Sequence, residues 1–294
     1  MATVVLLTVT GLGLGALYFL IASGLSLIWG LMRVLNFAHG AFFTIASYAA
    51  WTAGEALAGI PSLPLRWLAG LVAGVVAGAL VAALTEVVLI RPLYRQQIGQ
   101  VLVTVGLALA AVALVEGGFG SDPKQLALPA WMTATTTILG ASIPNTRVLV
   151  IVVALAVLGV LLLFLQHTRY GLIVRAGVEN RAMVSALGID VERAFTLVFA
   201  IGGAAAGLAG VLGGAYYGTI DPVRGTALLI FAFIVVMIGG LGSITGSAIA
   251  AAVVGLLQQF LNFYAATGSG DFAVVLLLAG VLLVRPGGVA GSIT

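Results

Sequence analysis

The sequence predicts an all-α polytopic membrane protein with about eight or nine transmembrane helices. One observation is its composition: 62% of the residues are hydrophobic and only 7% are charged, whereas a soluble domain carries about 25% charged residues. Long charge-free runs are the second observation. The third is that runs such as 148–165 lack the alternation of apolar and polar residues that barrel strands need. Lipid is therefore the expected solvent, and helices are the expected spans.

Charge-free runs long enough to cross a bilayer recur along the whole chain. A spanning helix needs roughly 20 apolar residues, and the chain 1–294 is expected to form one transmembrane domain. The predicted spans are 5–31, 37–58, 67–90, 98–117, 147–167, 194–217, 226–241, 245–265 and 271–285.

Two long loops separate these spans. The loop at about 118–146 is rich in Thr, Pro and Gly, and Trp131 within it is a suitable interfacial anchor. The loop at about 168–193 is the most polar stretch of the chain. The first is expected outside the cell and the second in the cytoplasm.

The basic residues predict the orientation, because cytoplasmic loops of a bacterial inner (plasma) membrane carry the excess of Lys and Arg. With the N-terminus outside and the C-terminus cytoplasmic, eight basic residues lie inside and four outside; the reverse orientation inverts the ratio. The inner group is Arg33, Arg91, Arg95, Arg169, Arg175, Arg181, Arg193 and Arg285. The outer group is Arg66, Lys124, Arg147 and Arg224.

Two breaks interrupt otherwise apolar regions. The first break, residues 33–40, reads RVLNFAHG, and the second break, residues 239–246, reads GGLGSITG. In each, a Gly opens a new helix of small residues, so the pair resembles a weak internal repeat. Paired breaks of this kind indicate a transport pathway. The alternative, that both are tight cytoplasmic turns between neighbouring helices, stays open at this stage.

Two polar side chains stand out in the first break. His39 could contact the substrate or relay protons. Alternatively, it could have a structural role and form a hydrogen bond with the backbone, which is the commoner role for a single histidine at a helix junction. Asn36 suits a cap for the helix that follows.

Small residues also recur at a spacing of four, which places them on one helix face and allows close approach of backbones. Packing within the chain is the expected role, and a subunit interface is the alternative. The residues are Gly70, Gly74 and Gly78, then Gly203 and Gly207, then Gly210 and Gly214.

Residues 175–193 predict a short amphipathic helix outside the membrane. Met183, Ala186 and Leu187 share a face at helical spacing. Gly188 suits a helix stop, and Asp190 suits an N-cap for the next span. Such a helix fits a lipid surface or a groove on a partner protein; an ordinary solvated loop is the remaining alternative.

Several kinds of chemistry are excluded. The chain has no cysteine, and its only lysine is Lys124, so the P-loop motif for ATP is absent. No catalytic, cofactor or metal constellation is evident, and a net charge of +3 does not suggest nucleic acid. Glu86 and Glu116 fall near span ends, where they are expected to reach the interface. Ion-driven pumps need buried ionisable groups, so energy is expected from elsewhere.

Several segments resemble the LivH-type branched-chain amino-acid permeases of ABC transporters. The stretch 11–43, which contains NFAHG at 36–40, is similar to the first segment of that family. The loop 169–190, the glycine-rich 239–247 and the ending RPGGVAG at 285–291 are similar to further segments, in the same order over nearly the whole chain.

The resemblance implies a permease subunit, not itself an enzyme, of an ATP-driven importer for branched-chain or other apolar amino acids. The implied partners are a second related permease subunit, two ATP-binding subunits and a periplasmic substrate-binding protein. The implied pathway residues are Asn36, Phe37, His39, Gly40, Gly239, Gly240, Gly242, Ser243 and Gly246. The implied ATPase-coupling residues are Glu179, Asn180, Met183, Ala186, Leu187 and Gly188.

Two other functions stay open from the sequence alone. One is an ABC permease for urea or short amides, which close relatives of this family carry. The other is a stand-alone channel or facilitator that needs no ATPase partner. A membrane enzyme is disfavoured because no catalytic constellation is evident.

Overall fold

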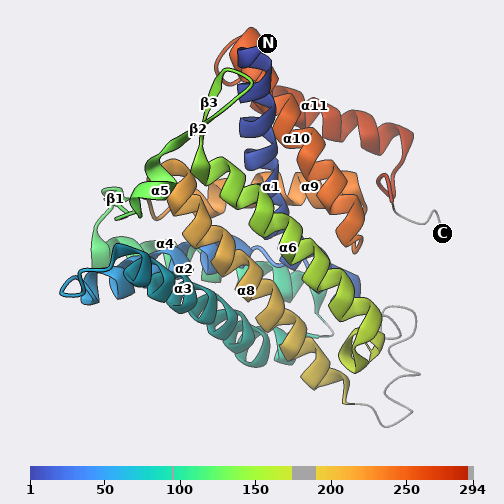
Figure 1. Cartoon of the computed structure of the whole chain (residues 1–294). Helices are drawn as coiled ribbons and strands as arrows, with labels where there is room; N and C mark the ends of the chain where they lie inside the picture. Colours follow the sequence, from blue (N-terminus) through green and yellow to red (C-terminus); the bar gives the residue numbers. More distant parts are fainter. Residues whose placement is uncertain (95, 174–189, 291–294) are drawn as a thin grey trace.

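The computed structural model describes residues 1–94, 96–173 and 190–290 (Figure 1). Within these ranges the chain is a helical bundle, and strands form only two short two-stranded ladders. The helices are α1 (Ala2–Met32), α2 (His39–Ala56), α3 (Leu63–Thr85), α4 (Gln97–Phe119), α5 (Ala130–Thr133), α6 (Asn145–His167), α8 (Val191–Tyr217), α9 (Arg224–Gly239), α10 (Ile244–Tyr264) and α11 (Ser269–Val284).

The prediction of an all-α polytopic membrane protein is confirmed. In the part of the chain that the structure describes, six helical stretches are long and apolar enough to cross a membrane. They are α1, α3 with its extension to Leu93, α4, α6, α8 and α10, and the apolar helices α9 and α11 are shorter. The predicted spans 37–58 and 226–241 coincide with α2 and α9, which are short for a specific reason described below.

The centre of the bundle is formed by α1 and α8, which run antiparallel. They cross where Gly24 meets Gly202: a Cβ atom added to Gly24 would lie 2.8 Å from the Cα of Gly202. On another side of α8, Gly78 of α3 packs against Gly207 at similarly short range. The small-residue stripes therefore pack helices within this chain, as expected, and bring their backbones into contact.

The second long partner of α1 is α10. A Cβ atom on Gly11 would lie 3.0 Å from the Gly255 carbonyl oxygen, and one on Gly30 would lie 3.2 Å from the Cα of Gly242. These two contacts show that α10 starts beside the C-terminal end of α1 and ends near its N-terminal end.

Two short ladders organise the loop between α4 and α6. Strand β1 (Lys124–Gln125) pairs antiparallel with β4 (Thr219–Ile220), which lies between α8 and α9. Strands β2 (Thr135–Ile138) and β3 (Ala141–Pro144) form a hairpin, which lies beside the N-terminal end of α1 (Figure 1). The β1–β4 ladder thus ties this loop to the segment that leads into α9.

Candidate translocation pathway

The first break turns back into the bundle. Helix α1 ends at Met32, and Arg33 adopts a left-handed conformation with φ 53°. The chain then returns so that His39, the first residue of α2, lies against Gly24 of α1. A Cβ atom added to Gly24 would be 2.9 Å from the His39 Nε2. Gly24 is eight residues before the end of α1, so α2 begins about 12 Å inside the bundle, at 1.5 Å per residue.

Helix α9 also begins inside the bundle, at the same place as α2. A Cβ atom on Gly40 would lie 2.6 Å from the carbonyl oxygen of Gly225, so the second residue of α2 touches the second residue of α9. Both positions need glycine because backbone occupies the space of a side chain. The two helices therefore meet N-terminus to N-terminus, and each leaves the meeting point toward a different end of the bundle.

The extended segments that precede these helices pack in a reciprocal way. Before α2, Phe37 lies with its ring 4.9 Å from that of Phe233 in α9. Before α9, the carbonyl of Pro222 accepts a hydrogen bond of 3.2 Å from Thr44 in α2, and Ile220 packs with Tyr48. Each extended segment thus runs along the helix that belongs to the other.

This arrangement corrects the repeat inferred from the sequence. The structural counterpart of the first break is residues 218–223, not the second break. Asp221 of that segment forms an ion pair of 2.5 Å with Arg224, the first residue of α9, and the segment lacks a glycine run like that of residues 239–246. Its signal in the sequence was a charged pair with Pro222 between two apolar runs.

The second break is a tight turn at the end of the bundle that also holds Arg33. Gly240 and Gly242 take positive φ angles of 99° and 87°. The Ser243 hydroxyl accepts a 3.0 Å hydrogen bond from the Gly246 N–H and so caps α10. The C-terminal segment closes on this turn, where the Ala290 N–H donates to the Gly239 carbonyl at 3.1 Å.

The predicted pathway residues therefore form two groups along α9. The first group, Asn36, Phe37, His39 and Gly40, lies beside α9 between Gly225 and Phe233. The second group, Gly239, Gly240, Gly242, Ser243 and Gly246, lies at its C-terminal end. Most of these residues are buried; Phe37 and Ser243 are half-buried, and Gly242 is exposed.

Polar atoms of the first group remain unpaired. The Asn36 carbonyl oxygen accepts from the Ala38 N–H at 3.0 Å, which fits its expected role at the start of α2. Among the described residues, however, the Asn36 amide nitrogen and both ring nitrogens of His39 make no hydrogen bond of standard geometry. Both residues are fully buried. The His39 ring nevertheless interacts with the backbone of Ile21 in α1, which is the kind of partner expected for a structural role, and a role of His39 in the pathway stays a prediction.

Glu86 departs from its expected place at the membrane interface. It is fully buried and accepts hydrogen bonds from Arg91 at 3.1 Å, from Thr196 of α8 at 2.6 Å and from Tyr94. The helix changes here from α to a π turn (Glu86–Ile90) and a 3-10 turn (Arg91–Leu93), because Pro92 has no N–H to donate. This charged cluster joins the end of α3 to the start of α8.

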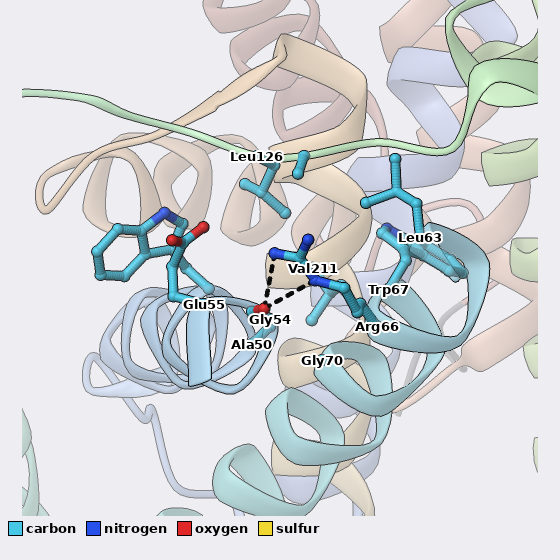
Figure 2. Close-up of a pocket in the computed structure, with 11 residues that line it drawn as sticks. Ala50, Gly54, Glu55, Leu63, Arg66, Trp67, Gly70, Leu126 and Val211 are labelled. Atoms are coloured by element: carbon cyan, nitrogen blue, oxygen red, sulfur yellow. Dashed lines mark hydrogen bonds between the residues drawn. The ribbon is translucent and has the colours of Figure 1, made fainter. Parts of the chain in front are cut away.

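A pocket opens at the opposite end of the bundle, between α2, α3 and α8 (Figure 2). Arg66 crosses it and donates to the Gly54 carbonyl through Nε at 3.1 Å and Nη2 at 3.0 Å. Glu55, Trp51 and Trp67 also line it, and Leu126 of the long loop covers it.

The coupling residues inferred from the sequence lie outside the described residues. These are Glu179, Asn180, Met183, Ala186, Leu187 and Gly188. The described chain resumes at Asp190, whose side chain accepts from the Arg193 N–H at 3.1 Å and caps α8 as expected.

Helices that cross the membrane, with two more that meet inside the bundle, define a multi-pass membrane protein of the transport type. Residues 7–285 match the family described as branched-chain amino acid transport system / permease component. The chain belongs to this family, and it is therefore a permease component of a transport system.

Individual relatives agree over nearly the full length. The high-affinity branched-chain amino acid transport system permease protein LivH of Escherichia coli K12 is 32% identical over 96% of this chain and 93% of its own. BraD of Pseudomonas aeruginosa, with the same description, is 32% identical over 96% of this chain and 94% of its own. The probable LivH permease of Methanocaldococcus jannaschii is 29% identical over 94% of this chain and 89% of its own. No solved structure matches the chain.

Proposed function

We propose that this chain is the membrane-spanning permease subunit of an ATP-driven ABC importer, and that it carries branched-chain or other apolar amino acids. The named relatives support the substrate class. The observation that supports the transport role most directly is the meeting of α2 and α9 at Gly40 and Gly225 inside the bundle. Discontinuous helices of this kind surround substrate sites in other transporters.

The proposed pathway passes the junction of α2 and α9. The partial positive charge of two helix N-termini is directed toward this point, which favours the carboxylate of an amino acid. Asn36 and His39 supply polar atoms, and Phe37 supplies apolar contact. The second break, from Gly239 to Gly246, is proposed to border the inner end of the same route.

The proposed orientation places the N-terminus outside and the C-terminus in the cytoplasm of a bacterial inner membrane. The described basic residues support this orientation, because more of them lie at one end of the bundle than at the other. Arg33, Arg91, Arg169, Arg193 and Arg285 lie at or next to the end where α1 and α9 finish. Arg66, Lys124 and Arg147 lie at the other end. Arg224 begins α9 inside the bundle, and its guanidinium extends toward that other end, over the ring of Tyr217.

The proposed partners are a second related permease, two ATP-binding subunits and a periplasmic substrate-binding protein. The segment that contains Glu179, Asn180, Met183, Ala186, Leu187 and Gly188 is proposed as the element that contacts the ATPase. The cluster around Glu86 supports this role for the region, because it links α3 to the start of α8 and so offers a rigid connection into the bundle.

The test of the importer is affinity purification of the tagged chain in mild detergent, followed by reconstitution into vesicles. Recovery of ATP-binding subunits and ATP-dependent uptake of labelled leucine are expected. Uptake of leucine in vesicles that hold this chain alone, without ATP, would instead identify a facilitator. Uptake of urea but not leucine by the complete complex would reassign the substrate.

A double variant, Met183→Asp with Leu187→Asp, tests the coupling segment. We expect the permease to fold but to lose the ATP-binding subunits during purification. The exposed Arg285→Gln serves as the control and should keep them. A complex that survives the double change would show that the ATPase is held elsewhere.

A further inference from the structure

The pocket at the outer ends of α2 and α3 contains two opposite charges that do not neutralise each other. Glu55 and Arg66 both line it, yet none of the ion pairs among the described residues includes either of them. The pocket is a half-open hollow with a cavity volume of about 30 Å³, so a ligand can place only its charged end in it. A separated cation and anion around one hollow suit a ligand that carries both charges.

On the cationic side of the pocket, several N–H groups of Arg66 have no hydrogen-bond acceptor among the residues that the structure describes. Arg66 uses Nε and one Nη2 hydrogen on the Gly54 carbonyl, which fixes the guanidinium and leaves three of its five N–H groups free. The indole Nε1 of Trp67 is buried, so it does not face the open hollow. In Figure 2, Arg66 lies between Trp67 on one side and Glu55 on the other.

The charges also decide which ligands are rejected. A simple anion that approaches Arg66 is repelled by Glu55, and a simple cation that approaches Glu55 is repelled by Arg66. A zwitterion satisfies both groups at once. Trp51 adds an aromatic surface to the lining, and such a surface favours the ammonium end of the ligand.

We propose that this pocket binds a zwitterionic head group, with a carboxylate or phosphate oxygen against Arg66 and an ammonium group against Glu55. Two sources share this chemistry: a free amino acid, and a phosphatidylethanolamine of the outer leaflet. The site is separate from the junction of α2 and α9, and the proposal does not depend on the transport mechanism.

The covering residue connects the pocket to the rest of the fold. Leu126 packs so closely on Gly214 that a Cβ atom there would lie 2.7 Å from its Cδ1, and the neighbouring strand β1 pairs with β4. A ligand under Leu126 therefore contacts the part of the loop that is tied to the segment leading into α9.

The test measures thermal unfolding of the full chain in nanodiscs of phosphatidylglycerol, with either phosphatidylethanolamine or L-leucine added. At least one addition should raise the unfolding midpoint by about 2–4 °C. Arg66→Gln and Glu55→Gln should each abolish that shift. Asp122→Asn, an exposed carboxylate in the same loop region but outside the pocket lining, should retain it.

Each outcome bears on the proposal. A shift with the lipid alone assigns the head group, and a shift with leucine alone assigns the free amino acid. No shift with either addition, or a shift that persists in both pocket variants, overturns the proposal. Uptake of leucine by the complete complex is measured separately, so failure of this site is distinguishable from failure of the importer.

Discussion

The two breaks look alike in sequence but differ in the structure. In both, an apolar helix runs into a short irregular stretch and a Gly-led helix follows. The first break brings α2 back into the bundle, and its Asn36 and His39 are fully buried. The second break is a turn at the end of the bundle, with Leu241 and Gly242 exposed.

The difference teaches that the depth of an irregular segment within the bundle depends on which residues pack against its backbone. The first break is enclosed because Phe37 reaches α9 and because Gly40 admits the backbone of Gly225. Irregular backbone at such depth is tolerated only when it is enclosed by protein. The second break satisfies its own turn through Ser243 and two glycines with positive φ, so it needs no enclosure.

The largest expected effect follows from closing the junction of α2 and α9. In Gly40→Val, the new Cβ atom would lie 2.6 Å from the Gly225 carbonyl oxygen, and neither backbone has room to move. We expect a loss of about 3 kcal/mol in stability and no transport, measured by thermal unfolding and by vesicle uptake. Gly159→Val in α6, where a side chain meets nothing within 4 Å, is the control. Equal effects in both variants would contradict the importance of the junction.

The next effect concerns the buried amide of the first break. Asn36→Leu keeps the branched shape and the number of side-chain heavy atoms but removes the oxygen that accepts from the Ala38 N–H. Leaving that buried donor unpaired should cost about 2 kcal/mol, and transport should fall further than stability alone explains, because Asn36 is also a proposed pathway residue. Unfolding midpoints and leucine uptake measure the two effects. An unchanged midpoint would show that water replaces the amide, and the first break would then be no more enclosed than the second.

A smaller effect is expected at the tip of the second break. Gly242→Ala places a side chain where φ is 87° and 3.0 Å from the Cα of Gly30. We expect a cost of about 1–2 kcal/mol, with transport still measurable because the turn is exposed. Gly106→Ala in α4, where nothing lies within 4 Å, is the comparison variant. Complete loss of transport in Gly242→Ala would place the second break on the pathway as firmly as the first.

The smallest effect is expected from the cap of α10. Ser243→Ala removes the bond to the Gly246 N–H, and loss of an N-cap costs about 1 kcal/mol. Ser243→Asp should restore most of the stability, since Asp is an equally good cap. If Ser243→Ala were more damaging than Asn36→Leu, the ranking of the two breaks would be reversed.

The prediction of the helices succeeded because lipid leaves few alternatives. Each predicted span coincides with a helix to within a few residues, since apolar runs of this length can satisfy their backbone in a membrane only as helices. The glycine stripes were also interpreted correctly, because spacing by four has one geometric meaning on a helix. Glu86 was misplaced, because its burial depends on Thr196 in α8 and on the π turn before Pro92.

The sequence by itself determined the solvent, the helices, the family and the two irregular stretches, because composition and local periodicity control these. Only the tertiary structure decided that the first break pairs with residues 218–223 and that α2 and α9 meet at their N-termini. It alone also brought Glu55, Arg66 and Trp67 around one pocket. The physical reason is that each of these features is a contact between backbones or side chains on different helices, and the hydrophobic pattern within one helix carries no information about which glycine of another helix it will meet.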